Sequence, residues 1–390
     1  MPPAAESPLV PLTKGGAWQR HARSFDAAFE RLDRRQLARI RAWSAKNLTA
    51  SSPTMFYMFS GPDFLYANAF YPNAKTYVLA GLEPVGAVPD LTKLRSVAAS
   101  LSHLEYSLGS ILSYSFFVTK KMKSNLRAGP VNGTLPILYV FLARSGKTIR
   151  DVTPVALDAE GVVQPEGDNG SAAHGVKIVF AGEDGEARTL YYFSTNLADS
   201  GFAKSGFAKF LEGLAPGDSL LKSASYLLHS GGFSRVRDFL LNRSALLVQD
   251  DSGIPLRHYD RQQWDLRPFG RYLGPIGIFP GRYQANYAVL FRNSQPIDFG
   301  IGYRWRPNQS NLLLAVKRSG ASMPVATTEP TSTEQAPTAG LGQDRENSAA
   351  RQAVRKHRST ARRTKRRVVR SRATPSWGWF ASPFWGARGR

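Results

Sequence analysis

The stretch Ser319–Ala350 holds too few large apolar side chains to offset the conformational entropy that a chain loses on folding. It is followed by a segment, Arg351–Arg390, that contains 13 Lys and Arg and no acidic residue. The sequence therefore predicts a flexible N-terminus at 1–17, one large α/β globular domain of one or two lobes at 18–318, a disordered linker at 319–350 and an Arg-rich, Trp-containing tail at 351–390.

The net charge of +22 divides unevenly along the chain. Of the 51 Lys and Arg, 13 belong to the last forty residues, which leaves 38 against 29 Asp and Glu in the rest, or +9. Hydrophobic residues make up 42% of the sequence, an ordinary value for a chain that buries a core. The absence of cysteine excludes disulfide scaffolds, thiolate metal sites and thiol nucleophiles.

The first third of the body shows a helical pattern followed by a strand, helix, strand order. Apolar residues recur at helical spacing over Ser24–Leu48, with a break expected near Asp33. Thr54–Phe59 is a short aromatic run typical of a buried strand, and we expect Ser60 to cap the short helix that follows. Thr76–Leu82 is the next strand. This order predicts a parallel pair joined by a right-handed crossover.

The rest of the body mixes helices with antiparallel hairpins. The longest apolar run, Leu135–Ala143, is too short to span a bilayer, so no transmembrane segment is expected, and we interpret it as a buried strand with Thr148–Leu157 as its hairpin partner. The other elements expected are a helix over Leu91–Val118 interrupted near Gly109, a hairpin of Val176–Ala181 with Thr189–Ser194, two or three helices within Phe202–Leu241, and strands at Ala245–Val248, Ile297–Tyr303 and Leu312–Val316. The fold class predicted is α/β, a mixed sheet with helices packed on it.

Two motifs resemble catalytic signatures but lack required parts. Ala143–Thr148 (ARSGKT) resembles the end of a phosphate-binding loop, yet Phe141 stands where that loop needs glycine, so a turn is expected. Asp251-Ser252-Gly253 matches the Asp-Ser/Thr-Gly of aspartic proteases, whose catalyst needs a second copy. Asp298-Phe299-Gly300 is a poor second copy, so a strand-end turn explains the motif better.

An enzymatic hypothesis remains open as an alternative. Adjacent carboxylates in a loop can bind a hard cation or orient a substrate, and a loop that follows a buried strand is a common place for ligands. The histidines lack the i, i+4 spacing of helical metal ligands, so no metal site is predicted and the cofactor stays unknown. A hydrolase or metal-assisted enzyme would use candidates from the set Ser60, Asp63, Asp250, Asp251, His229 and His258. Helix caps, turns and structural histidines are the competing explanations.

The tail carries the strongest signal for a partner. Arg-rich runs bind anionic membrane surfaces and also nucleic acid, and tryptophan is enriched at the lipid headgroup interface. Stacking on single-stranded bases would use the same aromatic residues, and a tail without any specific partner is the third possibility. The residues expected to bind an anionic surface are Arg355, Lys356, Arg358, Arg362, Arg363, Lys365, Arg366, Arg367, Arg370, Arg372, Trp377, Trp379 and Trp385.

The start of the sequence bears on the compartment. Met1–Gly16 is Pro-rich and lacks the apolar core of a signal peptide, so the sequence as written predicts a cytoplasmic protein. An Ala/Pro-rich start before a helix also resembles the beginning of a mature secreted chain. A signal sequence upstream of the written start would instead place the protein in the periplasm or cell envelope.

Three stretches together resemble an uncharacterised group of bacterial proteins, many of them exported. They are Phe56–Gly86, which contains FSGPDF and GLEPVG, Leu246–Pro255, which contains QDDSGIP, and Phe299–Trp305. The resemblance implies no activity, because none is known for the group. The first hypothesis is therefore a non-enzymatic envelope-associated protein that its tail holds to an anionic membrane surface; an enzyme and a nucleic-acid-binding protein are the alternatives.

Overall fold

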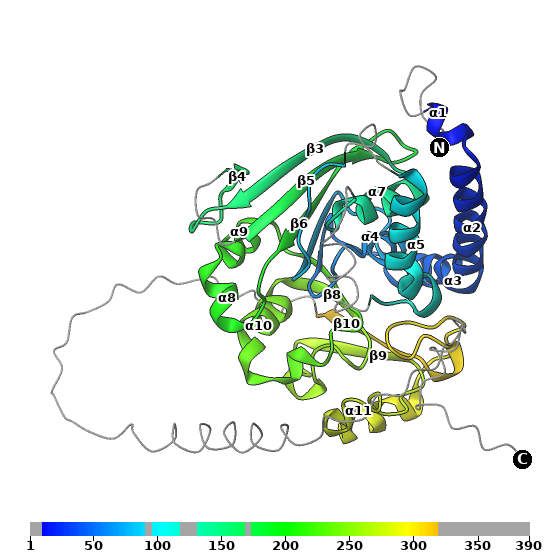
Figure 1. Ribbon diagram of the computed structural model, residues 1–390. Helices are drawn as coiled ribbons and strands as arrows, with labels where there is room; N and C mark the ends of the chain where they lie inside the picture. Colours follow the sequence, from blue (N-terminus) through cyan, green and yellow to red (C-terminus); the bar gives the residue numbers. More distant parts are fainter. Residues whose placement is uncertain (1–9, 90–95, 118–130, 168–172, 319–390) are drawn as a thin grey trace, which may run out of the picture. The chain divides into compact units, whose positions relative to one another are not determined.

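The computed structural model describes residues 10–89, 96–117, 131–167 and 173–318 (Figure 1). The predicted linker and tail, and every tail residue named above, lie outside these ranges. The chain divides into two units between Val325 and Ala326, within the predicted linker. In the described ranges, no helix combines the length and the apolarity needed to cross a bilayer.

The N-terminal segment is helical earlier than expected. Helix α1 (Val10–Lys14) and the start of α2 (Gly16–Leu32) fall inside the segment predicted to be flexible. The break predicted near Asp33 takes the form of a π-helical turn, Asp33–Leu37, which leads directly into α3 (Ala38–Asn47). A wider turn changes which side chains face the sheet without ending the helix.

A mixed sheet of ten strands forms the centre of the described body, as predicted. Its order is β4-β3-β5-β6-β2-β1-β7-β8-β10-β9. The middle strands β6-β2-β1-β7-β8 are parallel, and every other pairing is antiparallel. The bounds are β1 Thr54–Tyr57, β2 Thr76–Gly81, β3 Thr148–Leu157, β4 Val163–Pro165, β5 Ala173–Ala181, β6 Ala187–Ser194, β7 Gly217–Leu221, β8 Ser244–Gln249, β9 Trp264–Gly270 and β10 Asn311–Lys317.

Helices cover both faces of this sheet (Figure 1). One face packs against α2, α3, α4 (Phe64–Phe70), α5 (Val97–Tyr114) and α7 (Leu135–Arg144). The other packs against α8 (Asp199–Lys204), α9 (Phe207–Gly213), α10 (Ser234–Arg243) and α11 (Ala285–Leu290). Strand residues alternate between the two cores: Tyr57 belongs to the first, and Phe56 to the second. Burial on both faces explains why β1 shows an unbroken apolar run.

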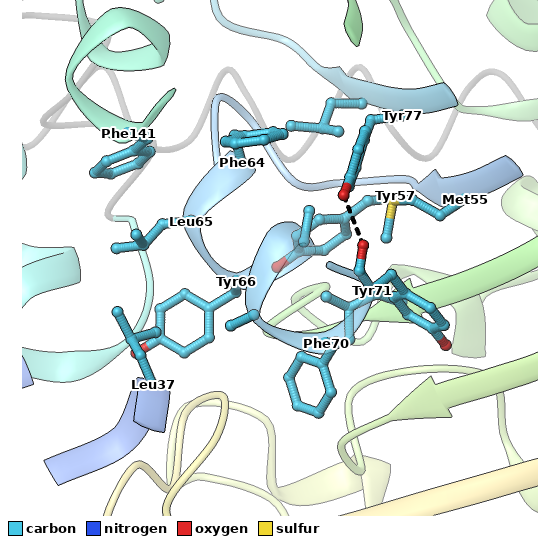
Figure 2. Packing of buried hydrophobic residues seen from close by; sticks show 14 of the residues in the cluster. Leu37, Met55, Tyr57, Phe64, Leu65, Tyr66, Phe70, Tyr71, Tyr77 and Phe141 are labelled. Atoms are coloured by element: carbon cyan, nitrogen blue, oxygen red, sulfur yellow. Dashed lines mark hydrogen bonds between the residues drawn. The ribbon is translucent and has the colours of Figure 1, made fainter. Parts of the chain in front are cut away.

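Helix α4 is buried along its whole length, because it lies between the sheet and the outer helices. Figure 2 shows Phe64, Tyr66 and Phe70 of this helix among Met55 and Tyr57 of β1 and neighbouring apolar side chains. The hydroxyl of Tyr77 donates a 2.6 Å hydrogen bond to the carbonyl of Tyr71, just beyond the helix (Figure 2). A buried tyrosine needs such a partner, and this bond ties the end of α4 to β2.

The interpretation of Leu135–Ala143 as a strand is wrong. The segment is helix α7, and Pro136 lies in its first turn, where a missing N–H costs nothing. Helix and strand cannot be told apart by periodicity when a short apolar run is buried on most sides, as α7 is. The turn at 145–147 therefore joins a helix to β3, and the predicted hairpin with Thr148–Leu157 does not exist.

Other expectations hold only in part or fail. The helices predicted within Phe202–Leu241 are found as α8, α9 and α10, but strand β7 lies between α9 and α10, and β9 was not predicted at all. Ile297–Tyr303 is a loop in which only Ile301 makes an isolated bridge, to Arg304. Helix α5 continues through Gly109, where an added Cβ would meet no atom within 4 Å, so nothing in the packing requires the predicted interruption.

The connections that leave two neighbouring strands cross opposite faces of the sheet, and this change of side defines a topological switch point. The chain leaves β1 through α4 on one face and returns as β2, which is parallel to β1 as predicted. It leaves β7 through α10 on the opposite face and returns as β8. Since β1 and β7 are neighbours, their following loops turn to opposite sides of the sheet. Such a switch point opens a crevice at the carboxyl ends of the strands.

Candidate functional site

A cavity of about 380 Å³ lies at this switch point. Open α/β sheets bind their ligands in the crevice at the carboxyl ends of such strands, and this volume is in the usual range for a small-molecule site. Aromatic and aliphatic side chains form most of the wall, and a few polar groups converge on it. The lining residues are Tyr57, Phe59, Ser60, Gly61, Asp63, Glu83, Phe116, Phe117, Lys222, Ser223, Ser225, Ile276, Ile278, Phe279 and Tyr303.

A buried ion pair forms part of the cavity wall. The Nζ atom of Lys222 lies 2.8 Å from Oδ2 of Asp63 and also donates to the carbonyl of Ser115. Asp63 accepts a 2.9 Å hydrogen bond from the Tyr57 hydroxyl, and the lysine ammonium lies 3.8 Å from the ring centroid of Tyr66. Burial raises the pKa of Asp63 and lowers that of Lys222, while their mutual attraction opposes both shifts.

The loop after β1 differs from the prediction in one respect. Asp63, not Ser60, is the N-cap of α4, because its side chain accepts the backbone N–H of Tyr66. Ser60 instead donates a 2.8 Å hydrogen bond to the carbonyl of Gly61. Both candidates line the cavity. The enzymatic hypothesis also needs Asp250 and Asp251 in the same pocket, and neither of them is part of this lining.

Both loops at the switch point contain residues in the left-handed backbone region. Phe59 after β1 has φ 62°, and Ser223, Ser225 and Tyr226 after β7 have φ between 52° and 55°. For a non-glycine residue this conformation is strained and costs free energy, and strained residues cluster at ligand and active sites. The strain therefore coincides with the cavity and marks the same two loops.

Glu83 is a cavity residue that the sequence reasoning missed. It is 3% exposed, follows β2, and its carboxyl group has no ion-pair partner among the described residues. The hydroxyl of Tyr192 lies 3.5 Å from Glu83 Oε2 and makes its shorter hydrogen bond, of 2.7 Å, to the backbone carbonyl of Glu83. A Cβ added at Gly81 would lie 2.9 Å from the Cα atom of Gly61 and would also meet the Glu83 Oε2 atom, so the close approach of the Gly61 backbone favours glycine there. A charged residue directly after a predicted central strand was the available signal.

A smaller cavity of about 130 Å³ adjoins the first, and the two share Phe59, Glu83, Ser223 and Ser225. Two buried hydroxyls in its lining, Thr195 Oγ1 and Ser223 Oγ, have no hydrogen-bond partner within the described chain. Buried polar atoms are almost always satisfied, so two unsatisfied hydroxyls at one cavity leave hydrogen-bonding capacity there for a polar ligand or for water.

Asp250 and Asp251 follow β8 at the same edge of the sheet but do not line either cavity. Asp250 accepts the backbone N–H groups of Ser223 and Ser252 at 3.1 and 3.0 Å. Asp251 accepts the hydroxyl of Tyr226 at 2.8 Å. Burial and the neighbouring Asp251 carboxylate raise the pKa of Asp250 to about 6. The pair holds the strained loop after β7, which fits the turn interpretation.

The two candidate histidines lie outside the cavity linings. His229 is buried beside the ring of Tyr226, and burial, with Arg282 as the next cause, lowers its pKa to about 4. Burial also lowers the pKa of His258. Within the described ranges, no three His, Cys, Asp or Glu side chains are grouped so that they could hold a metal ion. A catalytic role for the six candidates stays a prediction.

A larger cavity, of about 1070 Å³, lies at the opposite, amino end of the parallel strands. Arg188 and Asp184 in its lining form an ion pair, and Arg41 pairs with Asp33. A third lining cation, Arg144, pairs with Asp26 outside the lining. The switch-point cavity is smaller but holds the strained loops and the uncompensated Glu83, and for that reason we take it as the functional site.

Comparisons of the sequence with protein-family models and with curated proteins find no match. A comparison with solved structures finds none either. The chemistry of the cavity must therefore be argued from its own residues.

Proposed function

We propose that the α/β body binds a small organic amine with an apolar substituent in the switch-point cavity. The observation that carries the proposal is the carboxyl group of Glu83, which is buried and has no ion-pair partner in the described part of the chain. Taking a carboxylate out of water without a partner is costly, so proteins rarely do so unless a bound cation compensates it. An ammonium group of a ligand supplies that compensation.

Lys222 does not supply it. Its side chain is 1% exposed, and its ammonium contacts Asp63, the Ser115 carbonyl and the Tyr66 ring. With the two charges of that pair cancelled, the cavity keeps the negative charge of Glu83. An anionic ligand would be repelled by this charge, whereas a cation would be attracted.

The rest of the lining fits an amine that carries an aromatic or aliphatic group. Thr195 and Ser223 present hydroxyls that can bind the ammonium hydrogens or a neighbouring polar group of the ligand. Phe116, Phe117 and Tyr303 line the switch-point cavity, where aromatic faces favour both apolar groups and cations. The polar end of the ligand therefore belongs near Glu83 and the apolar end among the aromatic rings.

Calorimetric titration of the full-length protein with three matched probes tests the proposal. The probes are 2-phenylethylamine, 2-phenylethanol and 3-phenylpropionate, which differ in the charge of one end. We expect the amine to bind at least about tenfold more tightly than the alcohol, with no binding of the carboxylate. Glu83→Gln should remove the preference for the amine. Glu183→Gln, away from both crevice cavities, is the control.

Equal affinities for the three probes, or an unchanged amine preference in Glu83→Gln, would contradict the proposal. Circular dichroism of both variants shows whether they fold. A variant that folds and keeps its affinity for 2-phenylethanol but loses its preference for the amine isolates the charge of Glu83 from the shape of the cavity.

A second function, association with an anionic membrane surface, is supported by the sequence of the tail. Thirteen Lys and Arg without an acidic residue, together with Trp377, Trp379 and Trp385, suit the interface of an anionic bilayer. Sedimentation of the full-length protein with phosphatidylcholine vesicles, with and without phosphatidylglycerol, tests it. Replacing the three tryptophans by alanine should weaken binding to the anionic vesicles, and replacing the ten tail Arg and Lys of the predicted surface by glutamine should abolish it.

Nucleic-acid binding by the tail is the alternative for the same residues. Single-stranded DNA in the sedimentation buffer separates the two partners. Binding to DNA with a steep salt dependence and no sedimentation with anionic vesicles would replace the membrane proposal by the nucleic-acid one.

A further inference from the structure

We propose that the loop Arg271–Tyr283, called the mouth loop below, docks the α/β body on the surface of an anionic lipid bilayer. The loop connects β9 to α11 and contributes Ile276, Ile278 and Phe279 to the lining of the switch-point cavity. This surface belongs to the folded body, so the inference is independent of the tail and of the amine proposal.

Large apolar side chains of the mouth loop are exposed to water. Leu273 is 41% exposed, Ile278 63% and Tyr283 58%. Single exposed apolar residues are normal, but three within one short loop indicate a surface that another phase covers. Leucine, isoleucine and tyrosine are the kinds of side chain that enter the headgroup region of a bilayer when a protein lies on it.

The charge around these residues is complementary to anionic lipid. Arg271 and Arg282 belong to the mouth loop and Arg292 follows it, whereas Arg267, before the loop, is paired with Asp265. The sequence between Leu266 and Ile297 contains no Asp or Glu. An apolar loop that carries basic and no acidic residues of its own is expected to bind anionic surfaces, because hydrophobic insertion and electrostatic attraction add.

Contacts with the folded body fix the backbone of the mouth loop, while the side chains of Leu273, Ile278 and Tyr283 stay exposed. The guanidinium of Arg304 donates to the carbonyls of Gly274 and Pro275 at 2.9 and 3.0 Å. The N–H of Ile276 donates to the Tyr226 hydroxyl, and the ring of Phe279 packs on Tyr226 at 5.1 Å between centroids. A loop fixed in this way does not lose much conformational entropy when it inserts.

Docking by the mouth loop would place the entrance of the cavity against the lipid. Ile278 is both the most exposed apolar residue of the loop and part of the cavity lining. A ligand with an apolar part would then enter from the bilayer interface instead of from bulk water. If the cavity binds no amine, the docking surface stands unaffected, because the two tests use different residues and readouts.

The absence of cysteine allows a sharp test on the full-length protein. Ile278→Cys is labelled with an environment-sensitive fluorophore and mixed with equimolar phosphatidylcholine and phosphatidylglycerol vesicles. Val162→Cys is the matched control: Val162 is 52% exposed and lies beside β4, at the opposite end of the sheet from β9. Vesicles of phosphatidylcholine alone, and single-stranded DNA without lipid, complete the comparison.

We expect a blue shift of the label at position 278 with anionic vesicles and its quenching by spin-labelled lipid, with neither change at position 162. In unlabelled protein, Leu273→Asp with Ile278→Asp should weaken partitioning about tenfold or more, and Arg271→Glu about fivefold. Sedimentation with vesicles while the label at 278 stays in water would show that the tail alone binds and would overturn the inference. A shift caused by DNA without lipid would overturn it as well.

Discussion

The Nζ atom of Lys222 lies 2.8 Å from Oδ2 of Asp63, in an ion pair whose side chains are 1% and 2% exposed. The two residues follow the adjacent strands β7 and β1, so the pair joins the two loops that form the switch point. Asp63 also caps α4, and Lys222 also binds the carbonyl of Ser115 after α5. One buried contact therefore fixes three segments around the cavity.

Breaking this pair on one side should be much more harmful than removing both charges. Lys222→Met leaves the Asp63 carboxylate buried without its cation and should lower the free energy of unfolding by about 3 kcal/mol or more. Combining it with Asp63→Asn, which keeps an acceptor for the Tyr66 N–H, should recover much of that loss. Urea denaturation of the single and double variants measures both values.

Lys209→Met provides the matched control, because Lys209 pairs with Glu160 on the surface, where the two side chains are about half and three-quarters exposed. Exposed pairs contribute little, so this variant should unfold almost like the wild type. If Lys222→Met were no more harmful than Lys209→Met, the pair at the switch point would not be a structural element.

Much of the sheet could be predicted from sequence, but the strand that completes the site could not. The patterns at Thr54–Phe59 and Thr76–Leu82 predicted β1 and β2 because a strand buried on both faces shows a continuous apolar run. Strand β7 was missed because Gly217, Asp218 and Ser219 give it no apolar pattern. Asp218 is nonetheless satisfied by the backbone N–H groups of Ser52 and Leu246.

The same reason limited the prediction of the site. Asp63 was named as a candidate because it follows β1, but its partner Lys222 follows the strand that was missed. Glu83 stood in a predicted loop, and only its burial at the crevice shows that it differs from an ordinary surface glutamate. Pairing across a parallel sheet depends on long-range topology, which local sequence patterns do not encode.

Removing the charge of Glu83 should stabilise the protein without ligand. Glu83→Gln keeps the size of a buried side chain that has no ion-pair partner in the described ranges, so the variant avoids the cost of a buried carboxylate. We expect the free energy of unfolding to rise by about 1 kcal/mol. Thermal denaturation in the absence of amines measures this change, and a loss of stability would indicate that another group compensates Glu83.

His229 should make the stability depend on pH. Its pKa of about 4 in the folded protein is below the ordinary value of about 6.5, so between these values the unfolded chain binds more protons. The contribution of the neutral ring is fully present above about pH 6.5 and is lost as the pH falls toward 4. His229→Gln should therefore lose stability relative to wild type near pH 7.5 and recover on the order of 1 kcal/mol of that difference near pH 5.

Denaturation curves of wild type and His229→Gln at both pH values measure that change. The comparison must be a difference, because burial raises the pKa values of Asp218 and Asp250 to about 6, which favours the folded state at low pH in both proteins. His174→Gln, at a half-exposed position on β5, is the control. A constant difference between His229→Gln and wild type across the two pH values would rule out this role for His229.

Arg304 should control the mobility of the mouth loop. Its guanidinium binds the carbonyls of Gly274 and Pro275, and Arg304→Met would keep the aliphatic packing while removing both bonds. Hydrogen exchange followed by mass spectrometry should then show faster exchange at Ile276, whose N–H binds Tyr226, while the amides of β10 keep their protection. Arg267→Met, which loses only a surface bond to Asp265, should leave the loop unchanged. A mobile loop loses more conformational entropy on insertion, so Arg304→Met should also weaken the lipid response of the label at position 278. Unchanged exchange at Ile276 in Arg304→Met would show that the loop is held by its apolar contacts alone.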